Sequence, residues 1–146
     1  MKIRTVLIGI VALFGAAQIA SVRAEGTTPA QIADAFHEAL TFGNAASVGL
    51  LLAPDVTVLE GDHAQKSRQA YMEGHMKSDM AFMPYMQRTI LDRQVSIDGD
   101  LAWVTTFSKL QGSYNDRAYD LASRELLVMR KTSGGWQITL VHWSEK

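Results

Sequence analysis

The sequence predicts one α+β domain in which helices come first and long antiparallel strands follow. Three segments with helical spacing of apolar residues occupy the first half of the chain, and long β-rich segments joined by short turns fill the second half. Helices and strands that are grouped in this way, instead of alternating, are typical of an α+β layout. We therefore expect a largely antiparallel sheet covered by helices.

Three helices are expected. The first begins at Thr28-Pro29, where a threonine can cap the first turn and the proline lacks only an N–H that would have no partner there. The third stops before Pro84, because proline disfavours a helical conformation in the residue before it. Apolar residues recur at helical spacing along these segments. The expected helices cover residues 29–42, 45–52 and 66–82.

Five strands are expected, and most of them are joined by tight turns. Asp98-Gly99-Asp100 is a hairpin signal, and Asn115-Asp116 and Gly134-Gly135 mark two further turns. The segments between these turns are rich in β-branched and aromatic residues. The expected strands cover residues 56–60, 85–97, 101–113, 117–131 and 136–144.

The first 24 residues have the pattern of a cleavable signal peptide. A short basic start precedes an apolar run of about fifteen residues, and Val22-Arg23-Ala24 offers small residues at the cleavage positions. That run is short for a helix that must cross ~30 Å of hydrocarbon. We expect cleavage after Ala24, a mature domain of residues 25–146 that is periplasmic or secreted, and no membrane association after cleavage.

Composition excludes several kinds of function. Three of the 14 basic residues lie in 1–24, so 11 remain against 15 acidic residues and the mature net charge is −4. A nucleic-acid-binding domain needs clustered cations, which this balance argues against. The chain has no cysteine, which excludes thiol catalysis, disulfides and zinc–thiolate sites. We expect no cofactor.

Several short motifs occur in an order that resembles a known superfamily. The chain resembles nuclear transport factor 2-like proteins, which include ketosteroid isomerases, SnoaL-type polyketide cyclases, scytalone dehydratases and the association domain of calcium/calmodulin-dependent kinase II. The resemblance extends from Thr28 to Ser144. It is carried by Ala35-Phe36, Phe42-Gly43-Asn44-Ala45, Leu51-Leu52-Ala53-Pro54-Asp55-Val56, the hairpin from Val95 to Val104, Gly135-Trp136-Gln137-Ile138 and His142-Trp143-Ser144.

The resemblance implies a cone-shaped, strongly bent antiparallel sheet, with the three helices of the N-terminal half closing a pocket. It also implies a homodimer through the outer face of the sheet. It does not imply one activity, because one fold hosts many functions. The carboxylate base and the oxyanion donors of the ketosteroid isomerases have no residue-by-residue counterpart here, so no catalytic residue is carried over.

Side chains on the last two long strands are candidates for the pocket wall. In a strand, alternate residues share a face, which groups Glu125 with Ser123 and apolar neighbours, and groups His142 with Trp136 and Ile138. A pocket needs a few polar groups on mostly apolar walls. We therefore expect Glu125 and His142 to face the pocket as catalytic groups, although His142 can equally be a partly exposed residue near a strand end. Thr106, Ser108 and Ser123 are candidate ligand-binding hydroxyls.

The third predicted helix contains the most unusual pattern. His75 and Asp79 are i, i+4 neighbours, so the carboxylate can orient the imidazole for acid–base chemistry. Tyr71 would also face the ligand. Three interpretations of the methionines remain open: core packing, pocket lining by Met76 and Met80, or a site for reduced copper. The copper site would use His75, Met76, Met80 and Met83, and His63 could join either functional site.

These observations predict an exported domain that binds a small, largely apolar molecule. Proton-transfer chemistry of the isomerase, dehydratase or cyclase type needs no cofactor, and His75, Asp79, Glu125 and His142 would carry it. Two alternatives belong to other classes. One is a non-catalytic copper-binding protein. The other is an association module that dimerises through the outer sheet face, where Thr139 and Trp143 are expected.

Overall fold

The structure of the protein is a computed structural model, and it describes residues 26–145. The predicted signal peptide, 1–24, lies outside the described residues. Within them, no helix is both long enough and apolar enough to span a bilayer.

The helices lie where the sequence predicts them, with one break. The third predicted helix is interrupted at Gly74, which has φ −111° and ψ −104°, so it forms two short helices followed by a turn of 3-10 helix. Because of the break, His75 lies immediately before the second of these helices. The helices are α1 (Pro29–Thr41), α2 (Ala45–Leu51), α3 (Arg68–Glu73), α4 (Met76–Phe82) and η1 (Met83–Tyr85).

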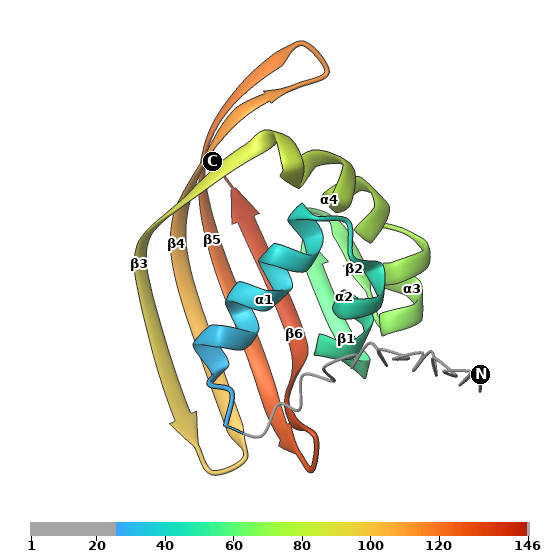
Figure 1. Cartoon of the computed structure of the whole chain (residues 1–146), viewed down its shortest axis with the longest axis vertical. Coiled ribbons are helices and arrows are strands. Elements are labelled where there is room, and N and C mark those ends of the chain that lie inside the picture. Colours follow the sequence, from blue (N-terminus) through green and yellow to red (C-terminus); the bar gives the residue numbers. More distant parts are fainter. Residues whose placement is uncertain (1–25, 146) are drawn as a thin grey trace, which may run out of the picture.

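The strands form one curled, unclosed sheet against which the helices pack (Figure 1). Its order is β2-β1-β6-β5-β4-β3, and the fold class expected from the sequence is confirmed. One pairing differs from the antiparallel expectation, because β1 runs parallel to β6. The strands are β1 (Leu52–Glu60), β2 (His63–Gln65), β3 (Met86–Asp98), β4 (Leu101–Tyr114), β5 (Arg117–Thr132) and β6 (Gly135–Glu145).

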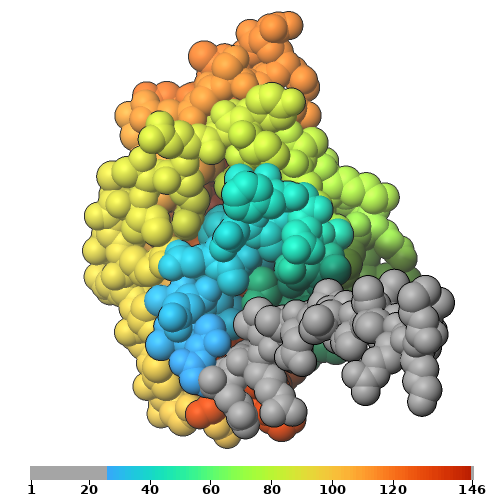
Figure 2. Space-filling view, viewed as in Figure 1, coloured from blue at the N-terminus to red at the C-terminus, as the bar shows by residue number. Residues whose placement is uncertain are grey.

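Helix α1 crosses the concave face of the sheet. Its start is fixed by a capping box in which the backbone N–H of Gln31 donates to the Thr28 hydroxyl and the backbone N–H of Thr28 donates to the Gln31 side chain. Gly43, at φ +65°, then allows the chain to turn into α2. Figure 2 shows α1 (blue) filling the space between β3 (yellow) and the shorter helices (green), with a narrow hollow beside β3.

The core lies between α1 and the concave side of the central strands. Phe36 of α1 is fully buried and stacks on Trp143 of β6, with ring centroids 6.0 Å apart and planes 12° apart. Leu127 and Ile138 are also fully buried. Each such side chain stabilises the fold by about 1.5–3 kcal/mol relative to an exposed position. This packing fixes α1 over the sheet and thereby positions the polar side chains beside it.

A bulge in β6 decides which side chains face the helices. Val128 pairs with Leu140 and Met129 pairs with Ile138, so Thr139 is an extra residue in the β5–β6 ladder. An extra residue reverses the alternation beyond it. Ile138 is therefore buried before the bulge, whereas Trp143 is buried after it.

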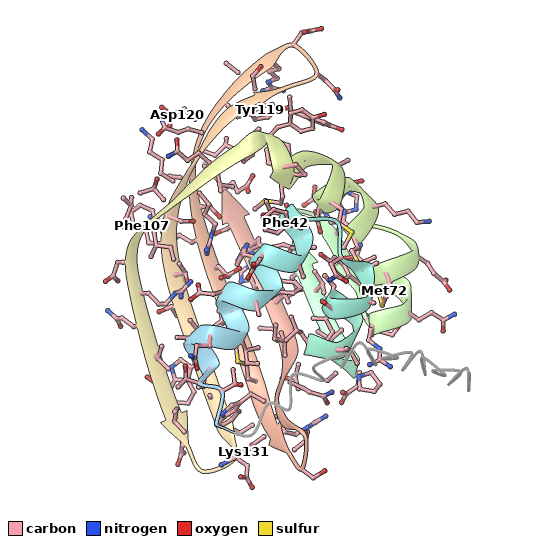
Figure 3. All side chains as sticks on the ribbon, viewed as in Figure 1. Phe42, Met72, Phe107, Tyr119, Asp120 and Lys131 are labelled. Atoms are coloured by element: carbon pink, nitrogen blue, oxygen red, sulfur yellow. The ribbon has the colours of Figure 1, made fainter. Side chains whose placement is uncertain are left out.

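Two features shape the long β4–β5 hairpin, in which Tyr119 and Asp120 lie on β5 a few residues after the turn (Figure 3). Its turn consists of Asn115 and Asp116 at positive φ, as two-residue hairpin turns require. Three residues before Asn115, Gly112 lies against the start of β3, where an added Cβ would come within 2.0 Å of the Tyr85 carbonyl oxygen. Only glycine fits at that contact.

Candidate functional site

A cavity of about 80 Å³ lies between the end of α1, η1 and the concave face of the sheet. This volume holds a few water molecules or a small organic compound. The walls combine apolar and charged side chains: His37, Leu40, Glu60, Asp79, Phe82, Met83, Arg88, Leu110, Ser123, Glu125, Trp143 and Glu145.

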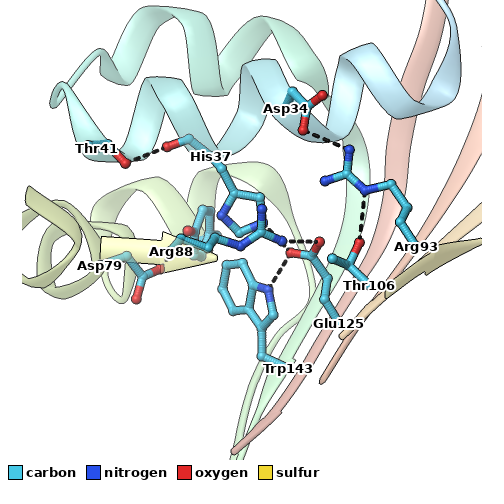
Figure 4. A network of polar contacts seen from close by, with 10 residues as sticks. Asp34, His37, Thr41, Asp79, Arg88, Arg93, Thr106, Glu125 and Trp143 are labelled. Carbon is cyan, nitrogen blue, oxygen red and sulfur yellow. Dashed lines mark hydrogen bonds and ion pairs between the residues drawn. The ribbon is translucent and has the colours of Figure 1, made fainter. Parts of the chain in front are cut away.

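The first group of polar residues, here the Glu125 cluster, consists of His37, Arg88, Glu125 and Trp143 (Figure 4). Glu125 Oε2 lies 2.5 Å from His37 Nε2 and accepts a hydrogen bond from the Trp143 indole N–H at 2.7 Å. Arg88 donates to the other oxygen at 3.4 Å. These partners come from α1, β3 and β6, so the carboxylate joins the helical layer to strands of the sheet.

Glu125 is ionised throughout the physiological pH range. Burial by itself would raise the pKa of Glu125, but the paired His37, Arg88 and the Trp143 N–H together lower that pKa to about 2. The side chain is only 2% exposed. It is therefore a permanent buried anion rather than a group that takes up protons near neutral pH.

His37 is the member of the Glu125 cluster that can move a proton. Its Nε2 faces the carboxylate, which favours a proton on that nitrogen. Its Nδ1 is buried and is one of three buried side-chain nitrogen or oxygen atoms in residues 26–145 that have no hydrogen-bond partner. Since His37 lines the cavity and its Nδ1 has no partner, Nδ1 is the ring nitrogen left to accept a proton, and Glu125 would stabilise the resulting cation.

The second group, here the Glu60 cluster, consists of Glu60, His75 and Asp79. His75 Nε2 contacts a carboxylate oxygen of Glu60 and lies 3.3 Å from Asp79 Oδ1. The other oxygen of Asp79 accepts a hydrogen bond of 2.6 Å from the buried Tyr71 hydroxyl. The expected pairing of His75 with Asp79 is therefore present, and Glu60 from the end of β1 adds a second carboxylate.

Carboxylates around the Glu60 cluster are incompletely neutralised. Burial, assisted by repulsion from Glu60 and Glu145, raises the pKa of Asp79 to about 6. The hydrogen bond from Tyr71 and the nearby His75 act in the opposite direction and lower this pKa in part. Burial, followed by repulsion from Glu60, also raises the pKa of Glu145. The pKa of Tyr71 is raised by burial and then by Asp79, so its hydroxyl stays a neutral donor.

Four of the predicted pocket residues lie on the concave face as expected. Glu125, Thr106, Ser108 and Ser123 are all buried there, and Ser123 lines the cavity. Thr106 pairs across the ladder with Glu125 and accepts a hydrogen bond from Arg93 at 3.3 Å.

The placement of His142 on the pocket wall is wrong. The bulge at Thr139 turns His142 to the convex face, where it is exposed, and turns Trp143 into the core. For the same reason Trp143 does not lie on the outer face with Thr139. His75, Glu125 and His142 therefore do not converge: His75 lies in the Glu60 cluster, Glu125 in its own cluster and His142 outside the cavity.

The methionines mostly pack, and they do not lie together around His75. Met76 and Met83 belong to the buried core, with Met72 and Met80 packed against it, so the core-packing interpretation is confirmed. Met83 lines the cavity, whereas Met76 and Met80 line a separate surface groove beside Met72 (Figure 3). The His75 imidazole is directed at Glu60 and Asp79 instead.

Sequence reasoning missed His37, Arg88 and Glu60. A weak signal existed for His37, because it lies four residues after the buried Ala33 and three before the buried Leu40, on the apolar side of α1. Arg88 and Glu60 lie at strand ends, where charged residues are usually solvated. Their inward direction depends on strand curvature and register.

Comparisons with known proteins agree with this architecture. A SnoaL-like domain matches residues 30–145. A candidate ketosteroid isomerase from Shewanella frigidimarina is 38% identical over 77% of this chain and 91% of its own, with a TM-score of 0.75. A candidate calcium/calmodulin-dependent protein kinase II association domain from Xanthomonas campestris is 26% identical over 80% of this chain and 84% of its own, with a TM-score of 0.66.

A candidate dehydratase of the NTF2-like family from Streptomyces avermitilis shares the fold, at 22% identity and a TM-score of 0.67, over 80% of this chain and 92% of its own. Curated protein sequences gave no match.

Proposed function

Since the chain belongs to the SnoaL-like domain family, we propose that it binds a small organic molecule in the cavity and moves a proton on it, in an isomerisation or dehydration. The observation that carries this proposal is the hydrogen bond between His37 Nε2 and the buried Glu125 carboxylate at the wall of the cavity. The similar structures named for isomerase and dehydratase activity favour the same reaction class.

In this mechanism His37 is the general base. Its Nδ1 removes a proton from a carbon next to a carbonyl group, and the proton then returns to another carbon of the same molecule. Glu125 keeps the proton on Nε2 and stabilises the imidazolium that forms, as a carboxylate does for any buried catalytic histidine. Arg88, which also lines the cavity, supplies the positive charge that a developing enolate oxygen needs.

The cavity volume restricts the substrate. Pockets that enclose drug-sized ligands measure about 300–1,000 Å³, and this cavity is about 80 Å³. The substrate is therefore a compound of few non-hydrogen atoms, smaller than a steroid. Apolar walls from Leu40, Phe82, Met83 and Leu110 favour a largely apolar ring or chain.

The test is the isomerisation of cyclohex-3-en-1-one to its conjugated isomer, cyclohex-2-en-1-one, followed by ultraviolet absorbance. The wild-type protein should accelerate this reaction, and His37→Gln should lower kcat/KM by ~100-fold or more, the usual contribution of general base catalysis. His142→Gln is the matched control, because His142 is exposed on the other face of the sheet, and it should leave the rate unchanged. No acceleration by the wild-type protein, or equal rates for wild type and His37→Gln, would reject the proposal.

A homodimer through the convex face is also part of the proposal. Trp103, Val128 and Leu140 form a cross-strand row on that face, and Trp103 is 41% exposed. Some of the similar structures are named as association domains. Trp103→Glu should convert a dimer to a monomer in light scattering. Ile97→Glu is the control and should leave the dimer intact, because Ile97 is exposed but pairs with the inward-facing Ala102 and so lies on the opposite face of the sheet. A wild-type monomer would reject this assembly.

We also propose that the domain acts after export, on the basis of the pattern in residues 1–24. Expression of the whole chain should give a mature protein beginning at Glu25 outside the cytoplasm. Mass measurement of a product that retains residues 1–24 would reject the proposal.

A further inference from the structure

The Glu60 cluster has a geometry that the proton-transfer proposal does not use. Its three side chains come from different elements: Glu60 ends β1, His75 precedes α4, and Asp79 lies within α4. One oxygen or nitrogen from each lies within 4.8 Å of the others. Both carboxylates approach the same ring nitrogen, His75 Nε2. A single N–H at that nitrogen is too little to satisfy two carboxylates.

We propose that Glu60, His75 and Asp79 bind a divalent transition-metal ion, with Zn²⁺ as the best match. Zn²⁺ takes histidine nitrogen and carboxylate oxygen ligands at about 2.0–2.2 Å in tetrahedral geometry, which places neighbouring ligand atoms about 3.4 Å apart. His75 Nε2 and Asp79 Oδ1 already lie at 3.3 Å. Glu60, which contacts the same nitrogen, needs only to withdraw slightly to admit the ion.

The surroundings of the cluster support a cation. Glu145, at the end of β6, lines the same cavity as Glu60 and Asp79. Among residues 26–145, no lysine or arginine forms an ion pair with Glu60, Asp79 or Glu145. Glu60 and Asp79 therefore share one imidazole, Glu145 adds a third carboxylate to the same cavity wall, and a divalent ion would balance their charge. The imidazole ligand favours a transition metal over Ca²⁺ or Mg²⁺, which prefer oxygen ligands alone.

Two neighbours complete the arrangement. Tyr71 donates its hydroxyl to Asp79 Oδ2, which leaves Oδ1 directed at His75. Hydrogen bonds of this kind orient carboxylate ligands in metal sites. His63 lies opposite Glu60 in the β1–β2 ladder, and its ring centroid is 5.8 Å from that of His75. His63 is exposed, so it can turn to become a fourth ligand.

While His63 is turned away, the three protein ligands leave a coordination position open. Because Glu60 and Asp79 line the cavity that also contains the Glu125 cluster, an ion between them would present that position to a ligand in the cavity. It would hold an oxygen atom of the ligand, while His37 acts on a carbon. The site is thus a further binding site in the cavity, and it is measurable whether or not cyclohexenone is turned over.

The experiment titrates the chelator-treated, full-length mature protein with Zn²⁺ by calorimetry and with Co²⁺ by visible absorption. Zn²⁺ should bind with saturation at one equivalent per chain, and Co²⁺ should give the intense bands of a low-coordinate complex. His75→Gln and Glu60→Gln should each weaken binding by at least ~10-fold, and His63→Gln should weaken it less. His142→Gln, an exposed histidine outside the cluster, is the matched control and should bind like wild type.

Absence of saturable binding, or equal weakening in His142→Gln and His75→Gln, would overturn the proposal. Circular dichroism would confirm that each variant is folded. If His75→Gln fails to fold, the ring resonances of His75 in the wild-type protein decide: they should shift on Zn²⁺ addition, and unshifted resonances at saturating Zn²⁺ would reject the site.

Discussion

The Glu125 cluster and the Glu60 cluster line one cavity but balance their charges differently. Glu125 is almost fully buried and has three donors, two of which can carry positive charge. Glu60 and Asp79 are 29% and 13% exposed and share one imidazole. The pKa of Glu125 is lowered to about 2, whereas that of Asp79 is raised to about 6. Burial acts in the same direction on both, so the partners decide the result.

This difference indicates a division of roles. A carboxylate with a complete set of partners stays ionised and can orient a neighbouring base, as Glu125 does for His37. A carboxylate that lacks partners costs stability in the charged form, unless a proton or a metal ion neutralises it. The structure therefore combines a completed ion-pair network and an incomplete one within the same small cavity.

The largest expected effect is the loss of stability on removing the Glu125 charge. Glu125→Gln leaves Arg88 and His37 buried without their anion, and removing one partner of a buried ion pair costs about 3–5 kcal/mol. Glu60→Gln, at a more exposed site, should cost less than ~1 kcal/mol. Urea unfolding at pH 7 measures both. Similar losses for the two variants would show that the clusters do not differ in this way.

Acid should act on the same network. The folded-state pKa of Glu125, about 2, lies below its ordinary value of 4.5, so its contribution to stability is complete above pH 4.5. It is lost as the pH falls from 4.5 towards 2. Because each tenfold difference in proton affinity between the folded and unfolded states is worth about 1.4 kcal/mol, the loss is about 3 kcal/mol. Urea unfolding of wild type and Glu125→Gln across this range should show the loss in wild type only.

Asp79 should behave in the opposite sense in the metal-free protein. Its folded pKa, about 6, lies above its ordinary value of 3.8, so the folded state takes up a proton more readily and gains stability as the pH falls from 6 towards 3.8. At pH 8 the charged form carries the full cost. Asp79→Asn keeps an acceptor for Tyr71 and should raise stability by about 1–2 kcal/mol at pH 8. Thermal melts of wild type and Asp79→Asn at pH 8 and pH 4 measure the difference in stability between the two proteins, which should vanish at pH 4. A variant that is less stable than wild type at pH 8 would contradict the prediction.

Local patterns in the sequence were enough to predict the α+β layout, the start of α1 and the inward face of β5. Local patterns did not predict the places where a single residue interrupts the regular geometry of a strand or helix. Strict alternation along β6 placed His142 inside, and the extra residue Thr139 reversed that face. Helical spacing predicted one helix where Gly74 makes two. The pairing of His75 with Asp79 is local and was predicted, but its contact with Glu60 depends on the position of β1.

His37 and His75 are assigned to two different clusters, and measuring both activities on both variants tests that assignment most directly. Cyclohexenone isomerisation and Zn²⁺ binding would be measured on His37→Gln and His75→Gln, each shown to be folded. The prediction is that His37→Gln loses turnover and keeps Zn²⁺ binding, whereas His75→Gln loses Zn²⁺ binding. Loss of Zn²⁺ binding in His37→Gln, or full turnover in that variant, would contradict the assignment of the two clusters.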